Sequence, residues 1–250
     1  MWKIEKMIIT NNLIFNENTV NIFTDASIKK FGEETVGCAG AYIVTGLDPN
    51  FGQQVKHIIR NSTNNNSEIT AIWIGINEAI KLRQAGFKGN INLFSDSKIC
   101  IFGLREWIFK WVRKSQGDQL IGSQGDPVLN QDVILQIVYT IMENNLNINL
   151  FHQNGHVLYN LPHHIEKAKN TFIQSNFPGL IDDVEDQLIY NISVANDIVD
   201  TFTRDELEVF YPTNSLYGAE KLVEVFYDPE TKRDILRKYN KLVGSININL

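Results

Sequence analysis

The chain has 250 residues and a formal net charge of −6 at pH 7, with 43% hydrophobic and 21% charged residues. This composition excludes an intrinsically disordered or collagen-like chain, and no apolar run reaches the roughly 18 residues of a membrane span. The start of the chain lacks the long apolar segment and cleavage site of a secretory signal. Two cysteines, Cys38 and Cys100, form no disulfide framework and no zinc-binding spacing, so we expect buried thiols in a cytoplasmic protein. The negative charge argues at first sight against a nucleic-acid partner, because phosphate binding depends on Lys and Arg.

The first half of the chain predicts a mixed α/β fold. Runs of β-branched and aromatic residues, several of which end at glycine or at an acid, indicate strands. Between residues 67 and 86, apolar residues recur at the spacing of one helix face. The predicted elements are strands at 19–25, 40–46, 55–60, 90–96 and 146–151, and helices at 67–86, at 97–114 with an interruption at Gly103, and at 127–145.

The second half is less regular. The segment 157–186 shows no clear period, and the apolar face of a helix follows at 187–204. A last helix is expected over 228–244, with Asp228 as its N-cap, Pro229 at its first position and Gly244 at its end. A mixed sheet of five strands with helices packed against it fits this order of elements.

Three acids share one kind of position in the predicted fold. Asp25 and Asp96 each end a strand, and Glu68 opens a helix. Carboxylates that gather at one site repel one another unless a cation compensates them. Carboxylate oxygens are ligands for Mg²⁺ or Mn²⁺, so these acids are candidate metal ligands.

Six short segments, in chain order, together resemble the motifs of type 1 ribonuclease H. A single acidic tripeptide would occur by chance, whereas this ordered set is specific. The segments are TDAS (24–27), TNNNSE (63–68), SDS (95–97), LREWIFKWVRK (104–114), PVLNQDVILQIV (127–138) and NGH (154–156).

The resemblance implies a ribonuclease H-like fold with additions. It assigns an N-terminal extension to 1–19, the core to 20–156, an insertion to 157–186, the last catalytic helix to 187–204 and a helical extension to 205–250.

By the same resemblance, the protein is a metal-dependent endonuclease that cuts the RNA strand of RNA–DNA hybrids. Two Mg²⁺ ions, or Mn²⁺ as a substitute, would be held by Asp25, Glu68, Asp96 and Asp197. The expected products carry a 5′-phosphate and a 3′-hydroxyl, and His156 would assist proton transfer or product departure.

Two of these assignments stay open. About thirty extra residues separate His156 from the acid of VANDIVDTFTR (194–204), relative to the family's spacing. Asp200 lies one helical turn after Asp197 and competes for the role of fourth ligand. His163 or His164 can replace His156.

Further residues match the family's substrate contacts. The amides of Asn64 and Asn65 can donate to and accept from a 2′-hydroxyl, although an asparagine run can also be a helix cap. Trp107 and Trp111 are four residues apart, which suits a core stripe as well as a nucleic-acid platform. The remaining expected contacts are Ser27, Thr63 and Lys98 near the cleaved strand, and Lys110, Arg113 and Lys114 near the DNA strand.

Two other functions compete with this hypothesis. One is a nuclease of the same fold that acts on another structured nucleic acid, and the other is a non-catalytic replication accessory protein. The charged helix of the C-terminal extension is either a contact surface, for nucleic acid or a replication protein, or a solvated face. We expect a monomer.

The net charge divides unevenly along the chain. Residues 20–156 contain 12 basic and 12 acidic side chains, whereas residues 157–250 contain 9 basic and 15 acidic ones. The whole surplus of acid therefore lies outside the core, and the charge of the chain does not oppose a nucleic-acid substrate there.

Overall fold

The computed structural model describes residues 8–117, 119–210 and 229–244. Its centre is a sheet of six strands in the order β4-β3-β2-β5-β6-β8. Strands β2, β3 and β4 form an antiparallel meander, whereas β2, β5, β6 and β8 run parallel to one another. The strands are β2 (Thr19–Phe31), β3 (Glu34–Thr45), β4 (Gly52–Ile59), β5 (Asn90–Ser95), β6 (Ile148–His152) and β8 (Val243–Gly244).

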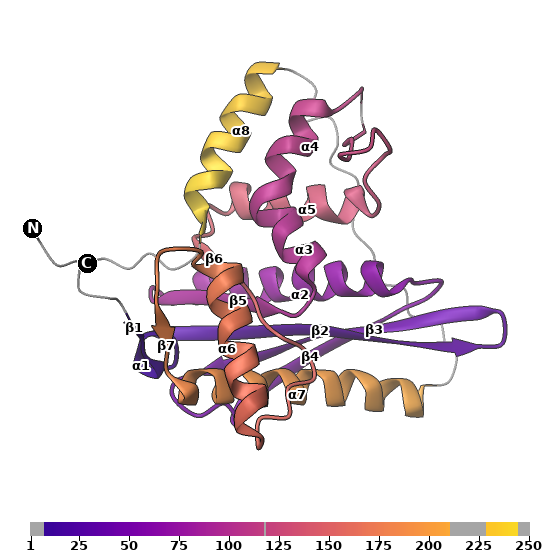
Figure 1. The fold of residues 1–250 in the computed structure, drawn as a ribbon. Helices are drawn as coiled ribbons and strands as arrows, with labels where there is room; N and C mark the ends of the chain where they lie inside the picture. The colour runs from indigo at the N-terminus through magenta and orange to yellow at the C-terminus, as the bar shows by residue number, and fades with distance from the viewer. Residues whose placement is uncertain (1–7, 118, 211–228, 245–250) are drawn as a thin grey trace, which may run out of the picture.

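Helices cover both faces of this sheet (Figure 1). On one face lie α2 (Asn64–Gln84) and α5 (Gln131–Glu143), and on the other lie α6 (Pro162–Asn176) and α7 (Asp186–Val209). Strand β2 is buried on both sides because its alternate residues serve two cores: Val20 and Ile22 pack with the α2 side, and Phe23 packs with the α7 side. Asp25 continues the alternation of Phe23 and therefore belongs to the α7 side.

A row of buried asparagines joins the three parallel strands of the core. The Asn149 side chain donates to Asn92 at 2.8 Å, Asn92 donates to Asn21 at 2.9 Å, and Asn21 donates to the Ile14 carbonyl at 3.0 Å. Each side-chain NH2 group in the row thus has an acceptor, which reduces the penalty of burying a polar group. The row fixes the mutual register of β2, β5 and β6.

A bent helical stretch rises from the end of β5. It consists of α3 (Lys98–Phe102), a π-helical segment η1 (Gly103–Trp107) and α4 (Ile108–Lys114). The interruption predicted at Gly103 is confirmed, and it has a packing cause: a Cβ there would lie 3.0 Å from the Trp111 ring.

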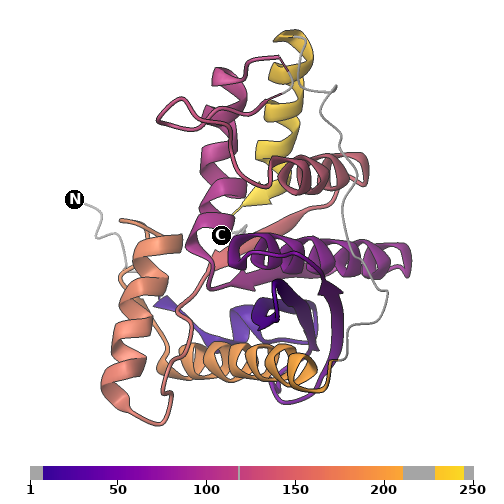
Figure 2. The same cartoon turned by 90° about the vertical axis from the view of Figure 1, so that its right-hand side faces the viewer.

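The parts outside the core add structure of their own. Near the N-terminus, β1 (Ile8–Ile9) and α1 (Asn11–Ile14) precede β2, and β1 pairs in parallel with β7 (Asp183–Val184). At the other end, α8 (Pro229–Leu242) leads into β8, and it stands beside α4 in both views (Figures 1 and 2). No helix in the described ranges is long and apolar enough to cross a membrane.

The predicted fold class is confirmed, with corrections to its details. The sheet has six strands instead of five, because Val243 and Gly244 pair with Ile148 and Asn149 of β6. For the same reason the last helix ends at Leu242 and not at Gly244. The segment 157–186, for which no period was found, contains α6. Asp228, the expected N-cap, lies outside the described residues.

Candidate active site

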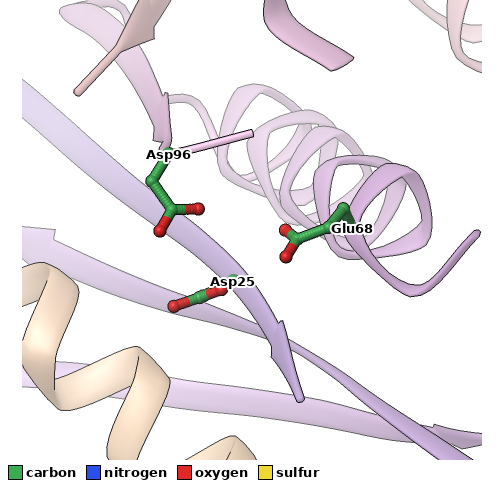
Figure 3. Close-up of side chains that lie close together, drawn as sticks. All are labelled: Asp25, Glu68 and Asp96. Carbon is green, nitrogen blue, oxygen red and sulfur yellow. The ribbon is translucent and has the colours of Figure 1, made fainter. Parts of the chain in front are cut away.

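Three elements bring Asp25, Glu68 and Asp96 together. Asp25 lies on β2, Asp96 directly follows β5, and Glu68 lies near the start of α2. Figure 3 shows the three carboxyl groups turned toward one another, and one ligand oxygen from each lies within 4.8 Å of the other two. The three acids expected from the sequence therefore form one cluster.

The cluster is buried and strongly repulsive. Asp25 is 5% exposed and Glu68 is 7% exposed. Burial, followed by the charge of Asp96, raises the pKa of Asp25 to about 8. Burial, followed by the charge of Asp25, raises the pKa of Glu68 to about 10. The pKa of Asp96 is also raised, again chiefly by burial.

This donor set fits a divalent cation. Among the described residues, nothing hydrogen-bonds Oε2 of Glu68, so this buried oxygen is available as a ligand. The donors are all carboxylate oxygens, which match Mg²⁺ and Mn²⁺ and not softer metals. A bound cation would also compensate the repulsion that raises the three pKa values.

The start of α2 is held close to the sheet. Thr63 caps the helix by accepting from the Asn66 backbone N–H at 3.2 Å, and the Ser67 hydroxyl lies 2.7 Å from that of Ser62. On the neighbouring strand, a Cβ at Gly37 would lie 2.1 Å from the Ser67 Oγ, so only glycine permits this approach. The cap and the close approach together point Glu68 into the cluster.

Of the two acids on α7, Asp200 is the one whose charge acts on the three acids of the cluster. The charge of Asp200 raises the pKa of Asp25, Glu68 and Asp96. Asp197 is exposed and instead influences Tyr159. The two acids differ by three residues, so Asp197 is displaced by about 4.5 Å along the axis of α7. These charge interactions favour Asp200 among the two candidates for the fourth ligand, and the choice between Asp197 and Asp200 stays a prediction.

The NGH segment also reaches the cluster. His156 has a left-handed backbone with φ of 50°, and its Nδ1 lies 3.9 Å from Oδ2 of Asp200. A Cβ at Gly155 would lie 2.1 Å from Oδ2 of Asp96. The alternatives, His163 and His164, begin α6 and contact each other at 4.5 Å between ring centres. The structure therefore favours His156 as the histidine of the site.

The expected substrate contacts fall into two groups. Ser27 lies on β2 beyond Asp25, where its hydroxyl is 3.1 Å from that of Thr203 on α7, and Lys98 is exposed at the start of α3. Asn64 is exposed in the first turn of α2, next to Asn65. The second group borders a hollow of about 680 Å³ between α2 and the bent helical stretch: Asn65, Trp107, Lys110, Trp111, Arg113 and Lys114.

Both interpretations of the two tryptophans have support in this hollow. Trp107 and Trp111 are half-buried, with ring centres 6.0 Å apart in an edge-to-face arrangement, and both line its wall. Trp111 also packs against the hydrophobic core. Each ring is anchored on one side and accessible on the other.

The sequence did not indicate His152, a buried histidine next to the cluster. It ends β6 and pairs with Ser95, the residue before Asp96. Burial lowers the pKa of His152 to about 4, against an opposing hydrogen bond to the Asp96 backbone, so the ring is neutral at pH 7. The only pattern that could have indicated His152 is its place at the end of a predicted strand. A single histidine after apolar residues is too common to predict a role.

The RNase H family model matches residues 17–163, which is more than half of the chain. The chain belongs to the ribonuclease H family. The match contains Asp25, Glu68, Asp96 and His156, and family membership makes the chain a nuclease. Asp197 and Asp200 lie beyond the matched residues, so the family match leaves the fourth acid undecided.

Two curated relatives and one solved structure illustrate the similarity. Ribonuclease H from Ruthia magnifica subsp. Calyptogena magnifica is 29% identical over 139 residues, covering 56% of this chain and 84% of the relative. Ribonuclease H from Hahella chejuensis (strain KCTC 2396) is 31% identical over 118 residues, covering 46% of this chain and 68% of the relative. The structure of LC11-RNase H1, isolated from compost by a metagenomic approach, is 14% identical with a TM-score of 0.42, covering 60% of this chain and 95% of that one.

Proposed function

We propose that this ribonuclease H hydrolyses the RNA strand of RNA–DNA hybrids with the help of divalent metal ions. The observation that carries the proposal is the buried cluster of Asp25, Glu68 and Asp96, whose ligand oxygens lie within 4.8 Å of one another. Three buried carboxylates at such distances destabilise a fold that has no cation to compensate them. Their retention at one sheet edge is best explained by metal-dependent phosphodiester chemistry.

In this proposal Asp25, Glu68, Asp96 and Asp200 hold two Mg²⁺ ions, which Mn²⁺ can replace. When bound, such a pair activates water and stabilises both the attacking and the leaving oxygen of an in-line displacement. Water attacks phosphorus and the 3′ oxygen leaves, so the products carry a 5′-phosphate and a 3′-hydroxyl.

The residues around the cluster have separate tasks in this reaction. His156 is 78% exposed and lies 3.9 Å from Asp200, so its ring can carry a proton between the site and solvent. Arg204 donates to Oδ2 of Asp200 at 2.9 Å and holds that carboxylate in place. Both residues position or move charge without being ligands themselves.

Recognition of the hybrid is assigned to the surface between α2 and α4. The exposed amides of Asn64 and Asn65 stand four and three residues before Glu68, where they can read the 2′-hydroxyl of the strand being cut. Ser27, Thr63 and Lys98 contact the backbone of that strand. Trp107, Trp111 and Lys114 line the adjacent hollow and contact the DNA strand.

The basic face of α8 extends this surface. Ile235, Tyr239 and Leu242 are buried, α8 packs against α5, and the centre of the Tyr239 ring lies 6.0 Å from that of the Phe109 ring of α4. A groove between α4 and α8 is bordered by Arg113, Arg233 and Arg237, and Arg113 also borders the large hollow. We favour phosphate binding over a replication-protein partner for this face, because the cations continue directly from the hollow.

Exposed ion pairs on α8 do not prevent such binding. The Arg233 and Arg237 side chains are about three-quarters exposed and pair with Glu230 at 4.0 Å and Asp234 at 3.0 Å. Pairs of this kind contribute about 0–1 kcal/mol, so a phosphate backbone can displace them.

The proposed setting is that of a monomer in the cytoplasm, where hybrids arise at primers during replication. All four proposed ligands come from one chain, which supports a monomer. Cys38 and Cys100 are buried free thiols, which suits a reducing compartment.

A panel of end-labelled substrates tests the proposal. We expect cleavage of the RNA strand of a hybrid in Mg²⁺ or Mn²⁺, with 5′-phosphate ends, and no cleavage of duplex DNA, duplex RNA or single strands. Asp96→Asn should abolish the activity. Preferential cleavage of another structured nucleic acid would support the redirected nuclease, and hybrid binding without cleavage would support the accessory protein.

A further inference from the structure

His152 is a buried polar side chain that the proposed chemistry does not use. It is 6% exposed at the end of β6, in the strand next to the one that delivers Asp96. A neutral imidazole offers one donor and one acceptor, and a buried ring needs partners for both.

His152 connects two distant parts of the chain. On one side, Nδ1 of the ring lies 3.0 Å from the Ser175 hydroxyl, in the last turn of α6. On the other side, His152 pairs with Ser95 at the end of β5, and the Gln153 N–H donates to the Ser95 carbonyl at 3.1 Å. His152 therefore lies between the last turn of α6 and the residue that precedes Asp96.

The backbone of His152 is held from the same helix. Asn176 accepts from the His152 N–H at 2.9 Å through Oδ1 and donates to the His152 carbonyl at 2.7 Å through Nδ2. Its side-chain amide thus pairs with the end of β6 as a neighbouring strand would. The parallel pairing with β8 involves only Ile148 and Asn149, so at residue 152 the Asn176 amide stands where that strand does not reach.

Arg105 of the π-helical segment completes the arrangement. Its guanidinium donates to Oδ1 of Asn176 at 3.0 Å and to the Ser175 carbonyl at 2.6 Å, and its side chain is 10% exposed. Charge-assisted hydrogen bonds of this kind are directional and hold their acceptors firmly. The end of α6 is therefore fixed by the helical stretch that begins two residues after Asp96.

Asp96 needs such support because the negative charge of Asp200 repels its carboxylate. The space for that carboxylate is also narrow, since a Cβ at Gly155 would lie 2.1 Å from Oδ2. A small shift of the strand end would move the carboxylate out of the cluster. Residues that orient a metal ligand in this way typically change metal affinity by about 10–100-fold when mutated.

We infer that α6, the helix of the insertion, positions Asp96 for metal binding through the end of β6, where Ser175 contacts the His152 ring and Asn176 holds the His152 backbone beside Ser95. His152 and Ser175 are positioning residues, since among the described residues no hydrogen bond joins either of them to a carboxylate oxygen of the cluster. The inference rests on the proposed function for its importance, but not for its test, which measures metal binding directly.

The test compares Ser175→Ala with Thr171→Ala in the full chain. Both remove one hydroxyl from α6, but Thr171 donates to the Lys167 carbonyl within its own helix and does not reach β6. Mn²⁺ binding is measured by isothermal titration calorimetry, and kcat and KM are measured on a hybrid substrate.

We expect Ser175→Ala to weaken Mn²⁺ binding about tenfold and to lower kcat with little change in KM, while Thr171→Ala matches the wild type. Arg105→Lys, which loses the forked contact with α6, should change Mn²⁺ affinity in the same direction. Wild-type Mn²⁺ affinity in Ser175→Ala, or an equal loss in Thr171→Ala, would overturn the inference. A wild type that binds Mn²⁺ but leaves hybrids intact would instead contradict the proposed function.

Discussion

At the scale of single residues, the site is defined by charges that the fold leaves uncompensated. Burial is the main cause of the raised pKa values of Asp25 and Glu68, and the other acids add to it. The positive charge of Arg204 lowers the pKa of Asp25, but it is the smallest of the causes. The cluster therefore costs stability in the metal-free protein and is stabilised by binding a cation.

This cost predicts how stability depends on pH. A carboxyl group whose pKa is raised in the folded state binds its proton more tightly there, so stability is lost as pH rises from about 4 through the folded pKa. For Asp25 the loss should be complete near pH 8. In EDTA at pH 8, we expect Asp25→Asn to increase the free energy of unfolding by roughly 1–3 kcal/mol.

Thermal unfolding at pH 5 and pH 8, with EDTA or with Mg²⁺, measures this effect. The difference in unfolding free energy between the variant and the wild type should shrink at pH 5, where Asp25 is protonated. It should also shrink in Mg²⁺, because metal binding stabilises the wild type. A variant that is less stable than the wild type at pH 8 in EDTA would show that Asp25 stabilises the fold through contacts that outweigh the repulsion.

The identity of the fourth ligand is a second prediction at this scale. The charge of Asp200 raises the pKa of all three acids of the cluster, whereas the charge of Asp197 raises the pKa of Tyr159. We expect Asp200→Asn to lower kcat by about 100-fold or more, a loss of several kcal/mol in transition-state stabilisation. Asp197→Asn, one turn away on the same helix, is the matched control and should stay within threefold. The opposite order of effects would restore our first assignment.

At the scale of elements, the short segment after β6 matters as much as the strands. Gly155 permits the close approach of Asp96, and the left-handed His156 turns the chain past Asp200. Gly155→Ala should displace the Asp96 carboxylate, because the new Cβ would clash with Oδ2. We expect kcat to fall at least about tenfold, which corresponds to about 1.36 kcal/mol in activation free energy.

A glycine outside the site provides the control for this substitution. A Cβ at Gly244, at the end of β8, would lie 4.0 Å from the nearest atom, which is Oδ1 of Asn149. Gly244→Ala should therefore leave kcat unchanged. Unchanged activity in Gly155→Ala, with Mn²⁺ affinity also unchanged, would show that the segment tolerates a side chain and does not fix Asp96.

Elements with a long apolar period could be predicted from the sequence, and the short ones could not. The helix containing Ile69, Ile72 and Ile76 was expected because burial imposes the period, and its first turn carries Glu68. The two-residue strands β7 and β8 have no period to detect, and each forms only through pairing with a distant partner. The choice between Asp200 and Asp197 stayed open in the sequence for a related reason, since it depends on how far α7 slides along the sheet.

At the scale of the whole molecule, the residues after the core carry the surplus of acidic side chains, but more than half of their basic side chains lie on one helix, α8. Residues 157–250 contain 15 acidic and 9 basic side chains, and five of the basic ones lie on α8. The loop at 115–126 contains no Lys or Arg. Figure 2 shows α8 beside α4, on the part of the molecule where that loop projects. The C-terminal extension thus supplies cations that the loop lacks.

This arrangement predicts a change in the salt dependence of hybrid binding. Arg233→Glu with Arg237→Glu should weaken binding of a long hybrid and reduce the slope of log affinity against log salt by about one unit per lost phosphate contact. A control with Lys88→Glu and Lys167→Glu has the same charge change on exposed sites elsewhere. Fluorescence anisotropy in Ca²⁺ provides the measurement. Equal slopes in the two double variants would assign α8 to another role, such as a protein partner.

The central claim is that the buried acids form the metal site of an RNA-strand nuclease. It is tested most directly by the rate at which Asp25→Asn cleaves the RNA strand of a hybrid at saturating Mg²⁺. We predict a rate at least about 1,000-fold below the wild type, a loss of about 4 kcal/mol, in a variant that is more stable without metal. A rate within tenfold of the wild type would contradict the account.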